Sequence, residues 1–366
     1  MNFDHSHYVP CLRWKQGEYL AVSQLPNTTK NVFTPLIEVP EIGWDFEKGR
    51  EAKTIDEHLA PFAKRIHDKW GKRTCFVDLN LIGPKERMAT GIHPVFFVFD
   101  GLRQRMCSAI PVTGLHRDDA HQREIRNIVA RSKSGICLRI QIEQAAKGSL
   151  KDDLDSLLSR LKIRSESCDL IIDLGAPSFV PLEGFSTAIQ QIGSKLPYLN
   201  NWRSFTVLST SFPATMAGIK RGGEVVTRHE WQLYKMLVAD LRKTKLRLPT
   251  FGDHTISHPQ VLDKDMRLLK PNATIKFTID DGWYIVKGNN VKDYGYEQFH
   301  GLSQQVLASR HYRDSAFSWG KEYIRKCANR SATRGNLTKW VQVGTNHHIA
   351  KVTQDIASFY ASLSSH

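Results

Sequence analysis

Apolar runs of strand length recur along this chain, and segments with the spacing of amphipathic helices separate them. The runs lie at residues 33–39, 75–81, 109–115, 136–142, 170–174, 205–209, 249–252 and 274–279. Between two of them, Leu154, Leu157, Leu158 and Leu161 repeat at the spacing of one helix face. Strands that are apolar throughout are typical of parallel sheets with both faces buried. The pattern therefore predicts an α/β protein assembled from repeated strand–helix units.

Eight such units in one uninterrupted stretch predict a closed (β/α)8 barrel of the TIM type. An open doubly wound sheet uses the same units, but this sequence has no glycine-rich dinucleotide turn after its first strand. We therefore expect the barrel over residues 1–270. A C-terminal elaboration of a β-hairpin and helices, residues 271–366, is expected to pack on the barrel and to be integrated with it.

One segment makes a ninth candidate for eight strand positions. Residues 8–14 either plug the floor of the barrel or form its first strand. In the second case residues 275–279 leave the barrel and pair with residues 283–286 across the turn Asp280-Asp281-Gly282. We favour the second arrangement, because a hairpin is an unusual way to close a barrel of parallel strands.

The formal charge of +14 bears on possible partners. Residues 301–366 supply a disproportionate share of it, with nine Lys and Arg against three Asp and Glu. Such a field favours an acidic partner, whether nucleic acid, a phosphate-bearing ligand or an acidic protein. The alternative is that the charge only keeps the protein soluble. The basic run from Lys321 to Arg334 could follow a phosphate backbone, but it fits a solvated helix face better and carries no nucleic-acid-binding motif.

The location of the chain is predicted from what the sequence lacks. No apolar run approaches the roughly 20 residues that span a bilayer, and the first residues are polar. We therefore expect a cytoplasmic protein with no signal peptide and no membrane contact. Its six cysteines are scattered, with no C-x-x-C pair, which indicates buried thiols rather than disulfides or a zinc site.

Polar residues follow the apolar runs at their carboxyl ends, which meet at one rim in a barrel. We predict catalytic roles for Glu38, Asp78, Arg139, Asp173, Asp253 and His348, and ligand-binding roles for Arg13, Lys15, Asn80, His116, Ser211, His254 and Trp340. A buried charge is costly unless it is paired or solvated, so this placement needs a reason. One reason is a polar pocket for a phosphate- or sugar-bearing ligand. The other is an internal ion-pair network among Glu38, Asp78, Arg139 and Asp173.

The possible metal site and the histidine pair of the last helix need separate arguments. No cofactor and no metal ligand are predicted, although carboxylates beside Asn80 would suit a hard cation such as Mg²⁺. Near the C-terminus, Thr345 or Asn346 is expected to cap the last helix, which places His347 and His348 in its first turn. There the helix dipole would lower the imidazole pKa and keep a neutral base or ligand near pH 7. Because neighbouring helix positions point in different directions, at most one of the pair should face a site, and we favour His348.

Several segments resemble the "beta" protein family of phages and prophages. The opening Tyr8-Val9-Pro10-Cys11-Leu12-Arg13-Trp14-Lys15-Gln16-Gly17-Glu18 and the run Thr34-Pro35-Leu36-Ile37-Glu38 are similar to the family's first two motifs. Further similar segments are Phe251-Gly252-Asp253-His254, Phe317-Ser318-Trp319-Gly320 and residues 340–349. The resemblance covers nearly the whole chain, and the combination of motifs is specific.

The resemblance implies a role rather than a reaction. Genes of this family lie beside a toxic gene called gop and a small regulator called cII in satellite phages and prophages. That cassette is associated with anti-phage defence, so a defence or toxin–antitoxin-like role is implied, with the neighbouring gene products as partners. The resemblance assigns no catalytic residue.

Two hypotheses follow. In the first, a regulatory or antitoxin-like barrel binds a partner protein or a ligand and does no chemistry. In the second, a barrel enzyme, such as a phosphodiesterase-type hydrolase, acts on a phosphorylated or nucleotide-like substrate. The enzyme should have unpaired carboxylates in an open pocket at the rim, whereas the binding protein should have a rim filled by its own C-terminal segment.

Overall fold

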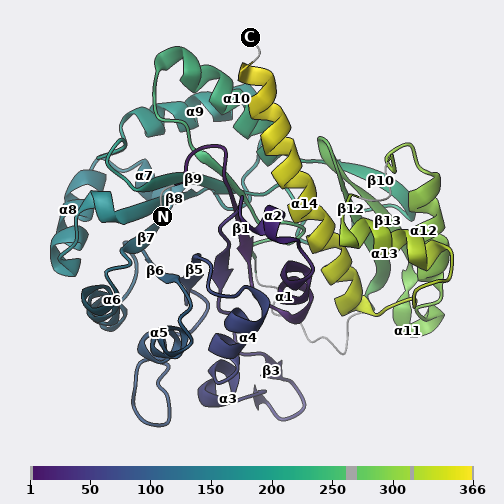
Figure 1. The fold of residues 1–366 in the computed structure, drawn as a ribbon, viewed down its shortest axis with the longest axis horizontal. Helices are drawn as coiled ribbons and strands as arrows, with labels where there is room; N and C mark the ends of the chain where they lie inside the picture. The colour runs from purple at the N-terminus through teal and green to yellow at the C-terminus, as the bar shows by residue number, and fades with distance from the viewer. Residues whose placement is uncertain (1–2, 261–269, 314–316, 365–366) are drawn as a thin grey trace. The chain divides into compact units, whose positions relative to one another are not determined.

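The computed structural model describes residues 3–260, 270–313 and 317–364, which form two compact units (Figure 1). The first unit contains residues 1–14, 34–209 and 233–253, and the second contains residues 15–33, 210–232 and 254–366. Each segment of the second unit begins a few residues or fewer after a strand of the first. The sequence predicted a single boundary after residue 270, whereas the compact units are each assembled from three segments of chain.

The first unit is a closed barrel of eight parallel strands. In chain order they are β1 (Tyr8–Leu12), β2 (Leu36–Glu38), β5 (Cys75–Asp78), β6 (Ala109–Thr113), β7 (Ile136–Gln141), β8 (Cys168–Asp173), β9 (Ser204–Ser209) and β11 (Thr250–Asp253). Strand β1 pairs with β2 on one side and with β11 on the other, which closes the ring β1-β11-β9-β8-β7-β6-β5-β2. The predicted barrel is confirmed, and so is the arrangement in which residues 8–14 supply the first strand.

Helices lie outside the ring of strands (Figure 1). They are α3 (Ile55–Leu59), α4 (Phe62–Lys69), α5 (Pro94–Gln104), α6 (Asp119–Ser132), α7 (Ile142–Ala145), α8 (Leu150–Leu161), α9 (Leu182–Ser194) and α10 (His229–Thr244), with a short hairpin of β3 (Trp44–Asp45) and β4 (Arg50–Glu51) before α3 and a 3-10 turn at Ser165–Ser167. The leucine stripe of the sequence becomes the buried face of α8. Helix α6 begins where Asp118 accepts hydrogen bonds from the amides of Ala120 and His121.

Apolar side chains fill the inside of the barrel. Val9, Cys11, Leu36, Phe76, Ile110, Val112, Cys137, Ile171 and Leu208 form one buried cluster. Burial raises the pKa values of the Cys11 and Cys137 thiols well above their usual range, so both thiols are neutral packing groups. Because this core is packed, polar chemistry in the barrel is confined to its ends.

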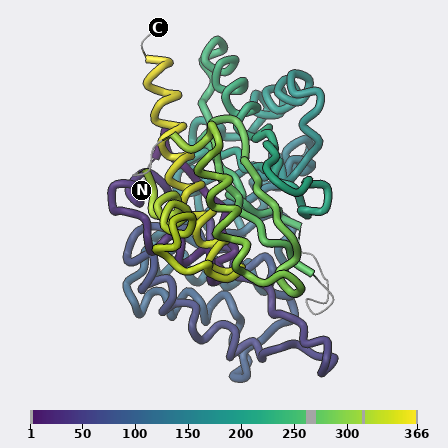
Figure 2. Tube along the Cα trace, turned by 90° about the vertical axis from the view of Figure 1, so that its right-hand side faces the viewer, coloured from purple at the N-terminus to yellow at the C-terminus, as the bar shows by residue number. Residues whose placement is uncertain are grey.

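The second unit is built on a three-stranded antiparallel sheet. Its strands β10 (Gly222–Thr227), β12 (Asn272–Ile279) and β13 (Gly282–Asn290) lie in the order β10-β13-β12, and β12 and β13 form the predicted hairpin. The helices of this unit are α1 (Gln16–Ser23), α2 (Asn27–Lys30), α11 (Val291–Tyr294), α12 (Gln298–Ala308), α13 (Trp319–Ala328) and α14 (Leu337–Ser364). Figure 2 shows α14, in yellow, beside the green strands of this sheet. Phe277, Phe299 and Trp340 belong to its core.

The predicted start of the last helix was wrong. Helix α14 begins at Leu337, so Thr345 and Asn346 lie inside it and do not cap it. Asn336 accepts the amide hydrogen of Lys339 at 2.9 Å, the bond that an N-cap residue makes. The histidine pair is therefore far from a helix end. Burial, and not a helix dipole, lowers the pKa of His347 to about 3.

Candidate functional site

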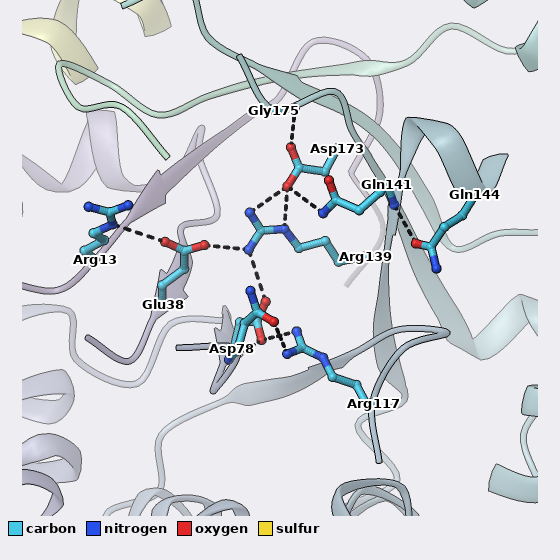
Figure 3. Close-up of polar contacts among 10 residues, drawn as sticks. Arg13, Glu38, Asp78, Arg117, Arg139, Gln141, Gln144, Asp173 and Gly175 are labelled. Atoms are coloured by element: carbon cyan, nitrogen blue, oxygen red, sulfur yellow. Dashed lines mark hydrogen bonds and ion pairs between the residues drawn. The ribbon is translucent and has the colours of Figure 1, made fainter. Parts of the chain in front are cut away.

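Four of the predicted catalytic residues meet at the carboxyl ends of the barrel strands (Figure 3). Glu38, Asp78 and Asp173 are the last residues of β2, β5 and β8, and Arg139 lies near the end of β7. The guanidinium of Arg139 donates to Glu38 Oε1 at 2.6 Å and to Asp78 Oδ2 at 3.1 Å. It also donates through Nε to Asp173 Oδ2 at 2.8 Å, and its second terminal nitrogen lies 2.7 Å from the same oxygen. We call these four residues the Arg139 cluster.

Further groups engage the remaining oxygen atoms of the three carboxylates. Asp78 Oδ1 accepts from the amide of Asn80 at 2.9 Å and from Arg117 at 2.7 Å. Asp173 Oδ1 accepts from the amide of Gly175 at 2.8 Å. Glu38 Oε2 lies 3.8 Å from Nε of Arg13. All six carboxylate oxygens therefore face a donor or a cation, and Figure 3 shows the guanidinium of Arg139 among them.

The charges of this region balance. Three carboxylates are opposed by the three guanidinium groups of Arg13, Arg117 and Arg139, so the formal charge of the set is zero. Burial opposes the charge of Arg139, yet Asp173 and Glu38 raise the pKa of its guanidinium well above its usual value. This geometry matches the internal ion-pair network that the sequence left open. The hydrolase hypothesis requires an unpaired carboxylate, and none of these three carboxylates is unpaired.

A metal ion fits this arrangement poorly. A hard cation such as Mg²⁺ needs oxygen atoms that converge on one point, but the oxygens of the Arg139 cluster converge on a guanidinium. Within residues 3–260, 270–313 and 317–364, no group of three His, Cys, Asp or Glu side chains could hold a metal ion. Cation binding here would require Arg139 to leave.

A cavity of about 270 Å³ lies beside the Arg139 cluster, past the ends of β5 and β6. The predicted ligand-binding residues Asn80 and His116 line it, together with Arg117, His93 and His121, which sequence reasoning missed. Arg117 connects the two regions, since it donates to Asp78 of the cluster and to Oδ1 of Asn80 in the cavity wall. The signals for the missed residues were weak ones: Arg117 follows a strand-end histidine, and His93 and His121 lie at helix starts.

The structure places Asp253 on a different contact. Its side chain is fully buried and accepts a hydrogen bond from the Tyr8 hydroxyl at 2.5 Å, which joins β11 to β1 where the barrel closes.

Five predicted site residues belong to the second unit: Lys15, Ser211, His254, His348 and Trp340. The backbone amide of Lys15 donates to Glu18 at the start of α1, and the hydroxyl of Ser211 donates to Glu230 at 2.6 Å. His348 Nδ1 lies 2.9 Å from the hydroxyl of Thr278. Trp340 donates to the carbonyl of Arg334 and stacks on Phe299, and His254 is buried. His254, His348 and Trp340 are packed interior groups, whereas Ser211 is partly buried and Lys15 is exposed at the start of α1.

The unusual C-terminal segments have a packing role in this unit. Asn346 accepts the amide hydrogen of Gly320 at 2.9 Å and donates to the carbonyl of Ala21 at 3.0 Å, so it joins α14 to α13 and α1. Gly320 has no room for a side chain, because an added Cβ would lie 2.2 Å from the carbonyl oxygen of Val343. Both histidines of the pair are buried, and His347 bonds the carbonyl of Thr278 at 2.9 Å.

Comparisons with known proteins agree with the motifs. A search of the curated proteins gives no match. No helix in the described part of the chain is both long and apolar enough to cross a membrane. The family model described as "Beta protein" matches residues 8–354, which include the barrel strands, the Arg139 cluster and most of the second unit. The chain therefore belongs to the Beta protein family.

Proposed function

We propose that this protein is the regulatory or sensing component of a phage-encoded anti-phage defence cassette of the toxin–antitoxin type. In this proposal it acts through the carboxyl end of its barrel, and its partners are the products of the neighbouring genes, a toxic gop protein and a cII-type regulator. Membership of the family supports the setting. The state of the Arg139 cluster supports the mode of action.

The observation that carries the mode of action is the pairing of all three carboxylates. A hydrolase needs a carboxylate that is free to take a proton or to bind a metal ion. Glu38, Asp78 and Asp173 are instead held by Arg139, and Arg117 also holds Asp78. Such a balanced cluster is a buried set of ion pairs that one incoming charge can rearrange. It suits recognition and switching better than acid–base catalysis.

Strand β8 supplies a matched control for the test. It carries Asp173 at its carboxyl end and Asp169 near its amino end, four positions apart on the same face of the strand. Both side chains are buried and both are paired with an arginine, Asp169 with Arg203. A neutral substitution at each position therefore removes a comparable buried charge at opposite ends of the barrel.

The experiment compares Asp173→Asn, Glu38→Gln and Asp169→Asn in a phage-challenge assay and in suppression of toxicity of the co-expressed neighbouring gene. Arg139 keeps two charged partners in the first two variants, so their free energy of unfolding should fall by about 1.5–3 kcal/mol, the range for a lost hydrogen bond to a charged group. We expect both to lose protection and Asp169→Asn to retain it at equal protein level. Wild-type protection by both rim variants would reject the proposal. Loss of protection together with loss of the fold would assign the cluster a structural role.

A further inference from the structure

The cavity past β5 and β6 contains a buried polar atom that lacks a partner. His121 is only 6% exposed, lines the cavity, and its Nε2 atom has no hydrogen-bond partner among the described residues. Leaving such an atom unsatisfied in a protein interior destabilises the fold, which is why natural cores rarely do so. A bound molecule that reaches His121 would supply the missing bond.

The groups around His121 indicate what that molecule carries. Arg117 donates to Asp78 and to Asn80, and these bonds use two of the five N–H groups of a guanidinium. His93 Nδ1 accepts the amide hydrogen of Val95 at 3.2 Å, which leaves its Nε2 as the protonated, donating nitrogen of the ring. The rings of His93 and His121 face the same cavity with centroids 6.3 Å apart. Arginine and histidine donors gathered in one hollow are suited to an oxyanion.

Apart from Asn80, His116 and the carboxylate of Asp118, the remaining lining is apolar and indicates an organic group beside the anion. Leu79, Ile82, Pro84, Pro94 and Val95 complete the wall, and a volume of about 270 Å³ exceeds the space that a bare inorganic anion needs. The first turns of α5 and α6 also reach this wall through Pro94 and His121, so the positive ends of both helix dipoles lie near the cavity.

We propose that this cavity binds a small organic phosphate, with the phosphoryl group between Arg117, His93 and His121 and its organic part against Ile82 and Pro84. The binding of this ligand does not depend on the proposed function. Its role as the signal that the carboxyl end of the barrel senses does rest on that function. Arg117 transmits occupancy to the Arg139 cluster, because a phosphoryl group competes with Asp78 for its guanidinium.

Binding should take up a proton. Burial and the nearby Arg117 lower the pKa of His121 to about 4, so its imidazole is neutral near pH 7. The other titratable groups that face it are Asp78 on β5, Asp118 at the start of α6, and His93 before α5. A phosphoryl group within hydrogen-bonding distance adds negative charge and raises that pKa. Near pH 6 the bound state then carries more protons than the free state.

The test uses titration calorimetry of the full chain with phenyl phosphate, and benzoate and phenol as comparison probes. We expect phenyl phosphate to bind, benzoate to bind more weakly and phenol not to bind.

His121→Leu should weaken binding of phenyl phosphate by roughly tenfold or more, since a bond to a charged group is lost. His7→Leu is the control, because His7 is similarly buried but lies before β1 at the other end of the barrel. Calorimetry at pH 6 in two buffers of different ionisation enthalpy measures the net proton change, which includes the phosphate's own ionisation, because its second pKa is about 6. The wild type should take up more protons, or release fewer, than His121→Leu.

Several outcomes would overturn the proposal. Absence of phenyl phosphate binding by the folded wild type means that water alone satisfies His121, and equal binding by His121→Leu places the ligand elsewhere. Benzoate binding as tightly as phenyl phosphate makes the ligand a carboxylate. Protection by His121→Leu in the phage-challenge assay, with binding lost, would reject the signalling role of this ligand. Failure of Asp173→Asn to reduce protection would reject the proposed function while leaving the measured binding intact.

Discussion

The two ends of the barrel pair their buried carboxylates with arginine in different ways. At the amino end, Asp169 is held by Arg203 and by the Ser204 hydroxyl at 2.7 Å, so one buried carboxylate has one arginine. At the carboxyl end, three carboxylates converge on Arg139. Closing a barrel does not require the second arrangement, because the first end does without it. Buried charge in excess of what the fold needs is expected where a protein binds or reacts.

The largest expected effect compares the two arginines. Arg139→Met removes one arginine from three buried carboxylates, of which Asp78 keeps Arg117 and Glu38 keeps the more distant Arg13. Arg203→Met removes the arginine of Asp169 alone, which keeps its bond to Ser204. Removing one partner of a buried pair costs about 3–5 kcal/mol, so Arg139→Met should reach or exceed that range and Arg203→Met should fall below it. Chemical denaturation with soluble yield measures both variants.

A combined variant keeps this comparison informative if Arg139→Met does not fold. Adding Glu38→Gln and Asp173→Asn removes two of the carboxylate charges that Arg139 had paired, so part of the lost stability and soluble yield should return. No recovery, or a larger loss for Arg203→Met than for Arg139→Met, would show that the Arg139 cluster is not held together by charge pairing.

An intermediate effect compares two buried histidines by their response to acid. Burial lowers the pKa values of His7 and His121 from 6.5 to about 4. The unfolded chain therefore binds more protons between those pH values, so each neutral histidine's contribution to stability is complete above pH 6.5 and is lost as pH falls toward 4. A shift of this size corresponds to on the order of 3 kcal/mol per histidine at the acid limit.

The histidine variants should separate the two ends. His7→Gln and His121→Gln should each flatten the acid limb of stability against pH, measured by denaturation from pH 7 to pH 4. The His7 ring bonds the Thr34 hydroxyl at 2.9 Å, but His121 Nε2 has no such partner among the described residues. Above pH 6.5, His7→Gln should therefore be the more destabilising of the two. Identical curves for the wild type and both variants would mean that neither ring is neutral because of burial.

The sequence predicted the barrel and its strand register well, because both depend on local patterns. The Asp280-Asp281-Gly282 turn indicated that residues 275–279 form a hairpin and not a barrel strand. The polar residues at the strand ends indicated the Arg139 cluster. The sequence could not predict the discontinuous second unit, because packing of residues 15–33 against residues 337–364 leaves no local pattern. It also could not place His93 and His121, because tertiary packing forms the cavity that they share, and neither residue follows a strand end.

The smallest expected effect tests the sign of the charge in the cavity. Asp118 lines the cavity and caps α6, so its carboxylate opposes a bound anion. Asn caps a helix about as well as Asp, so Asp118→Asn should change the free energy of unfolding by less than about 0.5 kcal/mol, whereas Asp118→Ala should cost about 1 kcal/mol. Removal of the charge should tighten phenyl phosphate binding about two- to fivefold, as expected for one solvent-screened repulsion. The control is Asp4→Asn, which removes a carboxylate near His7 at the other end of the barrel and should leave that affinity unchanged. Weaker phenyl phosphate binding by Asp118→Asn would contradict the predicted repulsion and would mean that Asp118 supports the site, for example by favouring the protonated form of His121, whose pKa it raises.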